Sequence, residues 1–202
     1  MYALVRLQFE LHKKPLLFLI VLLLIISFLF PASNIPIFTY IMAINAITSS
    51  TFLSNNAFYR TLHTMPVKRE SIVKSSYTFS FLFVSIIFMI LALFQVNTGM
   101  SYENPQEHWG FFTGFFGSAI VAIALQQYFI FTNEKVMKSS VDHALATFGS
   151  LFVIMAPHAA FCLIGPEETF YIRMMIMPII SCAFYVIILK ISIRAYKKRE
   201  LF

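Results

Sequence analysis

Charged residues are scarce in this chain of 202 residues: Asp, Glu, Lys and Arg together make up 12% of it, whereas 59% of it is hydrophobic. A water-soluble domain usually carries about 25% charged residues, and about half of it is apolar. A chain this poor in charge would precipitate as a water-facing globule, which excludes a soluble enzyme or binding domain. The mean hydropathy of +0.78 agrees with this. The composition therefore predicts an integral membrane protein.

Cysteine is also rare. Cys162 and Cys182 both lie inside apolar runs, so we interpret them as small hydrophobic residues rather than as a disulfide or metal framework. A cleavable signal peptide is not convincing either, because the segment 30–34, FPASN, is a poor small-residue cleavage site after the first apolar run. We therefore expect this run to be retained as a membrane span.

Motifs that carry chemistry are missing. The five histidines show no H-E-x-x-H spacing, and neither G-x-S-x-G nor the phosphate-binding G-x-x-x-x-G-K-[ST] occurs. The segment 167–173, EETFYIR, resembles the Glu-Glu-x-x-x-Arg signature of intramembrane CAAX-type proteases, but its spacing is one residue too long and the later histidine motifs are absent. We expect an acidic loop there, in which Arg173 pairs with Glu167 or Glu168. The chain is thus predicted to have no catalytic site, no metal site and no cofactor of its own.

Long apolar runs dominate what is present. A membrane helix needs about 20 apolar residues, and the runs are continuous rather than alternating as in the strands of a membrane barrel. We predict an all-α integral membrane fold, a single transmembrane domain over residues 1–202. Its six spans lie roughly at 15–32, 36–54, 76–97, 110–132, 141–164 and 170–190.

The positive charges predict the orientation. With six spans, residues 1–14, 55–75, 133–140 and the C-terminal tail share one side, and this side holds every Lys and Arg except Arg173. Basic loops stay in the cytoplasm, so both termini are expected to be cytoplasmic in a multi-pass protein of the plasma membrane. The net charge of +6 then reflects orientation in the lipid bilayer and not nucleic-acid binding.

The N-terminal segment 1–14 has a helical pattern of its own. Leucines recur on one face and charged residues lie elsewhere, which predicts an amphipathic helix in the membrane interface; the alternative is a frayed tail. The residues are Leu4, Leu7 and Leu11 against Arg6, Glu10 and Lys13.

Polar residues inside the predicted spans are candidates for lining a transport path, because such residues are costly in lipid. The alternative is that they bond across helix contacts, which Ser, Thr, Asn and Gln commonly do in membranes. The candidates are Asn45, Ser49, Gln126 and His158, and Gln127 lies beside one of them. Three glycines in the fourth span, Gly110, Gly114 and Gly117, favour close helix packing.

The segment between the second and third spans is basic and half apolar. A helix over roughly 56–64 should end at Met65, because the residue before a proline is disfavoured in the α region. After Pro66, residues 67–74 are expected to restart a helix that runs directly into the third span. Attraction of its cations to the anionic leaflet is the simpler explanation of the segment, but it leaves the apolar face and the proline corner unexplained.

This segment resembles a known family. LHTMPVKRESIVKSSY is similar to the Leu-Pro-Val-x-Arg-x-x-Ile-Val-x-x-x-Tyr segment of small ABC-2 type transporter permeases. Met65 stands where that family usually has Leu, and Ser76 where a Lys is common. The positions that match are Pro66, Val67, Arg69, Ile72, Val73 and Tyr77.

The resemblance implies that segment 55–75 contains a cytoplasmic coupling helix, which docks on a separate ABC ATPase subunit that binds ATP and Mg. It further implies pairing with a second copy of the permease or with a paralogue. The short, Phe-rich form is similar to permeases that export small amphipathic peptides, such as the phenol-soluble modulin exporters. The residues expected to dock are Phe58, Leu62, Met65, Pro66, Val67 and Arg69.

The main alternative is a secondary transporter or channel-like protein that works without an ATPase. Such a protein is expected to place charged residues deep in its spans. No Asp, Glu, Lys or Arg lies near the middle of any apolar run, so this alternative is disfavoured.

Overall fold

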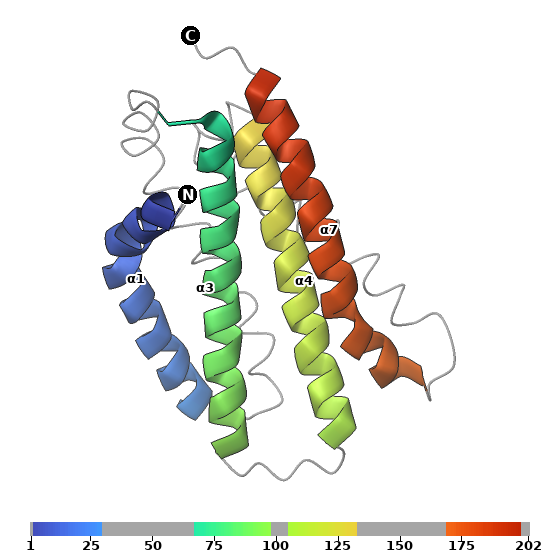
Figure 1. Cartoon of the computed structure of the whole chain (residues 1–202). Helices are drawn as coiled ribbons and strands as arrows, with labels where there is room; N and C mark the ends of the chain where they lie inside the picture. Colours follow the sequence, from blue (N-terminus) through green and yellow to red (C-terminus); the bar gives the residue numbers. More distant parts are fainter. Residues whose placement is uncertain (1, 30–66, 98–104, 133–168, 199–202) are drawn as a thin grey trace.

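The computed structural model describes residues 2–29, 67–97, 105–132 and 169–198, which form four helices without any strand. These are α1 (Tyr2–Leu29), α3 (Arg69–Asn97), α4 (Pro105–Thr132) and α7 (Phe170–Lys198). Helix α1 packs against α3, and α3, α4 and α7 pack against one another, α4 and α7 most extensively (Figure 1). The all-helical fold class is therefore confirmed for the described residues.

Three of the described stretches are long and apolar enough to cross a membrane, namely Arg69–Ile90, Phe112–Thr132 and Ile172–Lys198. They overlap the predicted third, fourth and sixth spans. The predicted first span, 15–32, overlaps α1, whereas spans 36–54 and 141–164 lie outside the described residues. The total of six spans therefore stays a prediction.

Helix α3 begins well before the predicted start of the third span at residue 76. The backbone N–H of Ser71 donates to the carbonyl of Lys68 at 2.8 Å, so the helical turn starts directly after Val67. Glu70 in the first turn interacts favourably with the positive end of the helix dipole. The part of the basic segment from Arg69 on is thus continuous with the third span in one helix, as the sequence predicts.

Helices α4 and α7 approach each other closely at Gly117. A Cβ atom added to this glycine would lie 3.0 Å from the carbonyl carbon of Met177 and 3.0 Å from Oγ of Ser181. It would also lie 3.1 Å from the backbone nitrogen of Pro178. A side chain would therefore collide with the backbone of α7, and the close packing predicted for this glycine is confirmed.

Pro178 lies inside α7 at this crossing. Because proline has no N–H, the carbonyl of Met174, one turn earlier, loses its usual donor from within the helix. The hydroxyl of Thr113 on α4 lies 3.5 Å from that carbonyl oxygen, although it bonds more closely, at 2.8 Å, to the carbonyl of Trp109. The one hydroxyl hydrogen of Thr113 is therefore directed mainly to Trp109, and its contact with the Met174 carbonyl across the helix interface is a weak one.

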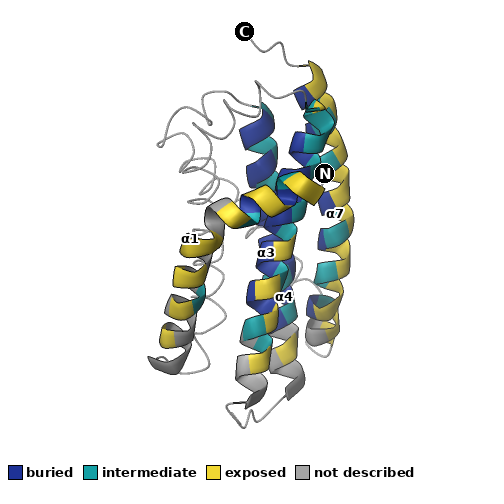
Figure 2. Cartoon of the chain, turned by 60° about the vertical axis from the view of Figure 1, so that its left-hand side comes forward, coloured by how far each residue is buried: buried dark blue, intermediate teal, exposed yellow. Residues whose placement is uncertain are grey.

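The first part of α1 runs across the beginning of α3, and the rest of α1 follows the bundle (Figure 2). Val5 and Gln8 are buried on this face, and the ring of Phe9 meets that of Phe79 edge to face at 4.9 Å. Leu4 also packs inward, whereas Leu7 is 38% exposed. The face that contacts the bundle is therefore turned away from part of the leucine stripe, and the position of this helix in the membrane interface stays a prediction.

Helix α7 lies at the edge of the described bundle. Only 17% of its apolar stretch is buried, against 61% and 67% for those of α3 and α4. Large apolar side chains are exposed along its outer face, as a surface that faces lipid requires. They are Ile172, Met175, Ile176, Ile179, Ile180, Val186, Ile187 and Ile191.

Candidate coupling region at the start of α3

Two of the predicted docking residues lie within the described part of the chain. Val67 is half-buried and packs against the core, and Arg69 is the first residue of α3. Nη1 of Arg69 donates to the backbone carbonyl of Lys197, in the last turn of α7, at 3.4 Å. The other four docking residues, Phe58, Leu62, Met65 and Pro66, lie outside the described residues. The docking role of all six stays a prediction.

Glu70 connects the same two helix ends through charge. Its carboxylate receives Nζ of Lys197 on one oxygen and Nζ of Lys74 on the other, both at 2.6 Å. Lys74 lies one turn along the same helix, whereas Lys197 comes from the last turn of α7. All three side chains are partly exposed, so solvent weakens these ion pairs, and they orient the helix ends more than they stabilise the fold.

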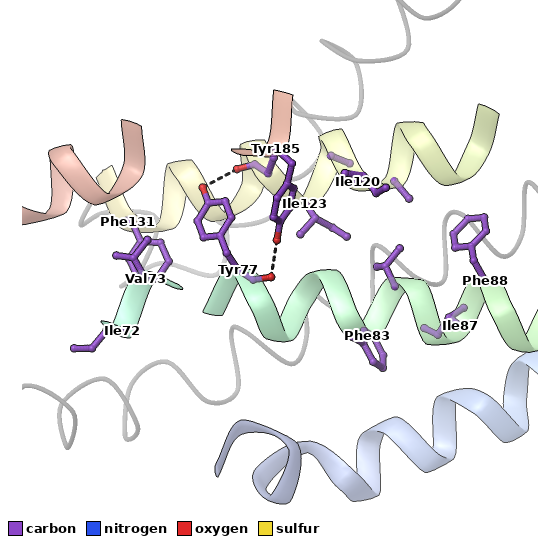
Figure 3. Close-up of a cluster of buried hydrophobic side chains, with 14 of the residues drawn as sticks. Ile72, Val73, Tyr77, Phe83, Ile87, Phe88, Ile120, Ile123, Phe131 and Tyr185 are labelled. Carbon is purple, nitrogen blue, oxygen red and sulfur yellow. Dashed lines mark hydrogen bonds between the residues drawn. The ribbon is translucent and has the colours of Figure 1, made fainter. Parts of the chain in front are cut away.

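The next residues of the family segment anchor α3 in the bundle. Ile72, Val73 and Tyr77 are 2%, 0% and 0% exposed, and all three belong to the central apolar cluster (Figure 3). The ring of Tyr77 lies between Phe131 of α4, at 6.4 Å between centroids, and Tyr185 of α7, at 5.2 Å. Half of the matching positions thus serve to pack the start of α3 against its neighbours.

Tyr77 also carries polar contacts to both neighbouring helices. Its hydroxyl donates to the carbonyl of Ala124 on α4 at 3.1 Å and lies 2.7 Å from the hydroxyl oxygen of Ser192 on α7. Its backbone carbonyl accepts a hydrogen bond from the hydroxyl of Tyr185 at 2.6 Å, drawn as a dashed line in Figure 3. Three helices therefore meet at one buried residue.

A second polar bridge lies beside the first. The hydroxyl of Ser76 donates to Oε1 of Gln127 at 2.9 Å, and Nε2 of Gln127 donates to the hydroxyl oxygen of Ser80 at 3.0 Å. All three residues are buried. Gln127 therefore bonds across a helix contact, which is one of the two roles that the sequence left open for its region.

The candidates for lining a transport path fall mostly outside the described residues: Asn45, Ser49 and His158 all do. Gln126 is described, and its side chain is 1% exposed within the bundle. Its place on a path stays a prediction. Within the described ranges, His, Cys, Asp and Glu side chains form no cluster of three or more that could hold a metal ion.

Sequence reasoning missed the hydroxyl contacts of Tyr77. The hydroxyl contacts Ser192, 115 positions away, and the backbone carbonyl of Tyr77 accepts from the hydroxyl of Tyr185, 108 positions away, so no local pattern connects these residues. One sequence signal could have indicated such contacts, namely the free-energy cost of burying polar groups in a membrane. Ser76 and Gln127 are polar residues next to or within apolar runs, where each needs a partner.

The comparison with protein families agrees with the sequence and the geometry. The chain matches the family of ABC-2 family transporter proteins over residues 3–197, which is almost its whole length. No curated protein and no solved structure matches it. Apart from Tyr2 and Lys198, the match covers all four described helices, including the start of α3. The chain therefore belongs to the ABC-2 family of membrane transporter proteins and is the membrane subunit of a transporter.

Proposed function

We propose that this chain is the transmembrane subunit of an ABC exporter and that separate cytosolic ATPase subunits drive it. The observation that carries the proposal is the attachment of α3. The predicted coupling segment 55–75 ends in the first turns of this helix, where Glu70 contacts α7 and Tyr77 contacts both α4 and α7. A movement of this segment would therefore be transmitted directly to α3 and, through these contacts, to α4 and α7. Membership of the ABC-2 family supports the same role.

In this proposal, two permease chains form the transport path, either as two copies of this chain or as this chain with a paralogue. ATP and Mg bind to the ATPase subunits, and their movement exposes the path alternately to the two sides of the membrane. The start of α1, the start of α3 and the end of α7 lie at one end of the bundle (Figure 1). The basic residues gathered at this end support its placement in the cytoplasm.

The proposed cargo is a hydrophobic or amphipathic substance, most simply a small peptide. The chain contains 24 Phe and one Trp, and none of its apolar runs has a charge near the middle. A transport path with an apolar and aromatic lining binds the apolar face of an amphipathic helix better than it binds a sugar or a free ion.

The test begins with purification of the tagged chain from its own membranes, in order to identify an associated ATPase by its phosphate-binding motif. The two proteins are then reconstituted in liposomes, and transport of a fluorescent amphipathic peptide is measured with ATP. The matched control carries an ATPase whose phosphate-binding lysine is replaced by alanine. We expect transport only with the active ATPase. Transport that follows an ion gradient and ignores ATP would support the secondary transporter instead.

A further inference from the structure

Among the described side chains, several polar bonds join the beginning of α3 to its neighbours. They involve Glu70 in its first turn, then Ser76, Tyr77 and Ser80. Further along α3, aromatic rings are among the described contacts to α4: the ring of Phe88 lies 5.4 Å from that of Phe112 and 5.1 Å from that of Phe116. Between membrane helices, van der Waals packing tolerates small shifts, whereas a hydrogen bond weakens steeply when its distance or angle changes.

The hydrogen positions at Tyr77 follow from its partners. The carbonyl of Ala124 can only accept, so the single hydroxyl hydrogen of Tyr77 is directed to it. The Ser192 hydroxyl must therefore donate to the oxygen of Tyr77. One side chain thus holds α4 by donating and α7 by accepting. These groups are buried, so separating any of them without a new partner carries the full cost of desolvation.

We infer that Tyr77 is a positioning residue, whose hydroxyl makes the adjoining parts of α4 and α7 follow the first turns of α3 when the ATPase moves segment 55–75. This inference rests on the proposed function. Without the hydroxyl, α3 would still pack in place, because the ring contacts to Phe131 and Tyr185 do not depend on it. The movement of α3 would then reach α4 through the bridge of Gln127 with Ser76 and Ser80, and α7 through the Glu70–Lys197 pair and the Tyr185 hydroxyl, without the one side-chain contact that joins all three helices.

The test substitutes Tyr77→Phe in the full complex of permease and ATPase in liposomes. The measured quantity is the amount of a fluorescent amphipathic peptide transported per ATP hydrolysed, together with the stimulation of ATPase activity by this peptide. We expect the variant to bind the ATPase and to keep its basal hydrolysis within about twofold, whereas transport per ATP falls by about tenfold, as the loss of a buried hydrogen bond implies. A merely structural role would lower the yield of complex and its thermal stability but leave this ratio unchanged.

Ser75→Ala is the matched control. Ser75 is also buried and lies two residues before Tyr77, but its hydroxyl donates to the carbonyl of Ile72 in its own helix at 2.9 Å. We expect the ratio of transport to hydrolysis to remain at the wild-type value in this variant. An equal fall in Ser75→Ala and Tyr77→Phe would overturn the inference, because any buried hydroxyl of α3 would then have the same effect.

Ser192→Ala keeps the inference testable even if Tyr77→Phe does not fold, because it removes only one of the bonds. Its ratio should fall by less than that of Tyr77→Phe, and the double variant should be no worse than Tyr77→Phe alone, since both act through one contact. If the wild type shows ATP-driven transport and the ratio of transport to hydrolysis is unchanged in both Ser192→Ala and Tyr77→Phe, the inference about Tyr77 is wrong and the proposed function stands. Absence of ATP-driven transport by the wild type sinks the proposed function instead.

Discussion

Lys197 and Glu70 lie 127 positions apart in the sequence, yet their side chains form an ion pair of 2.6 Å that joins the last turn of α7 to the first turn of α3. The pair lies where the predicted coupling segment enters the bundle. Arg69 strengthens the same junction by donating to the carbonyl of Lys197. The first turn of α3 and the last turn of α7 are therefore held together at one end of the bundle.

Export should depend on the signs of the charges at the junction between Glu70 and Lys197. Glu70→Gln removes the pair and should have a small effect, because the groups are partly exposed. Glu70→Lys should reduce export more strongly, since it places a third cation beside Lys74 and Lys197. The double variant Glu70→Lys with Lys197→Glu should recover part of the loss. Export by the variants side by side, at low and high salt, measures this; the differences should shrink at high salt. Equal export by Glu70→Lys and the double variant would contradict the role of the pair.

The apolar residues of the predicted coupling segment should matter more for docking than its charge does. Phe58→Ala combined with Leu62→Ala should weaken binding of the ATPase, because a small interface depends on one or two buried anchors worth roughly 2 kcal/mol or more each. Lys68→Gln should do much less, since Lys68 is exposed and an exposed charge contributes little. Pull-down of the ATPase and export are measured for both variants, with membrane insertion checked in each. The reverse ranking would favour a segment that serves only to hold the anionic leaflet.

Gly117→Ala should destabilise the contact between α4 and α7. The new methyl group would lie 3.0 Å from the backbone of Met177, so the helices must move apart, and overpacking of this kind costs about 1–3 kcal/mol. Thermal unfolding in detergent measures the loss. Ser118→Ala is the control, because it is the adjacent buried residue and its hydroxyl donates to the carbonyl of Gly114 in the same helix. If both variants unfold at the wild-type temperature, the close approach is not important for stability.

The orientation can be tested by labelling single cysteines in a chain whose Cys162 and Cys182 have been replaced by serine. A cysteine at Ser101 should react with a membrane-impermeant reagent in intact cells. A cysteine at Lys68, which is exposed just before α3, should react only after permeabilisation, and the half-buried Ser71 should do so more slowly. Labelling of Lys68→Cys in intact cells would place the coupling segment outside and remove its access to a cytosolic ATPase.

The proposed cargo predicts which substances stimulate the assembled complex. Short amphipathic helical peptides should raise ATP hydrolysis severalfold, whereas sugars and metal ions should leave it at the basal rate. The matched control is a scrambled peptide of the same composition, which has the same hydrophobicity but no apolar face. Stimulation by sugars or ions but never by peptides would exclude the peptide class of cargo.

Much of this protein follows from its sequence alone. Apolar runs of membrane length and the confinement of all but one cation to the predicted cytoplasmic segments are local properties, so they predict a helical membrane protein and an orientation for it without any knowledge of tertiary contacts. The continuation of the basic segment into α3 was predicted in the same way, from the position of Pro66. The residues of the family segment predict the ABC-2 family, and the family comparison confirms this prediction.

Only the tertiary structure decided which faces meet. A membrane helix is apolar on nearly every side, so hydrophobic periodicity does not tell which face packs on another helix and which faces lipid. The bond of Tyr77 to Ser192 and the pair of Glu70 with Lys197 join residues more than 100 positions apart, and no local pattern encodes them. The polar residues of the start of α3 were visible in the sequence, but their partners depend on the order in which the chain packs its helices.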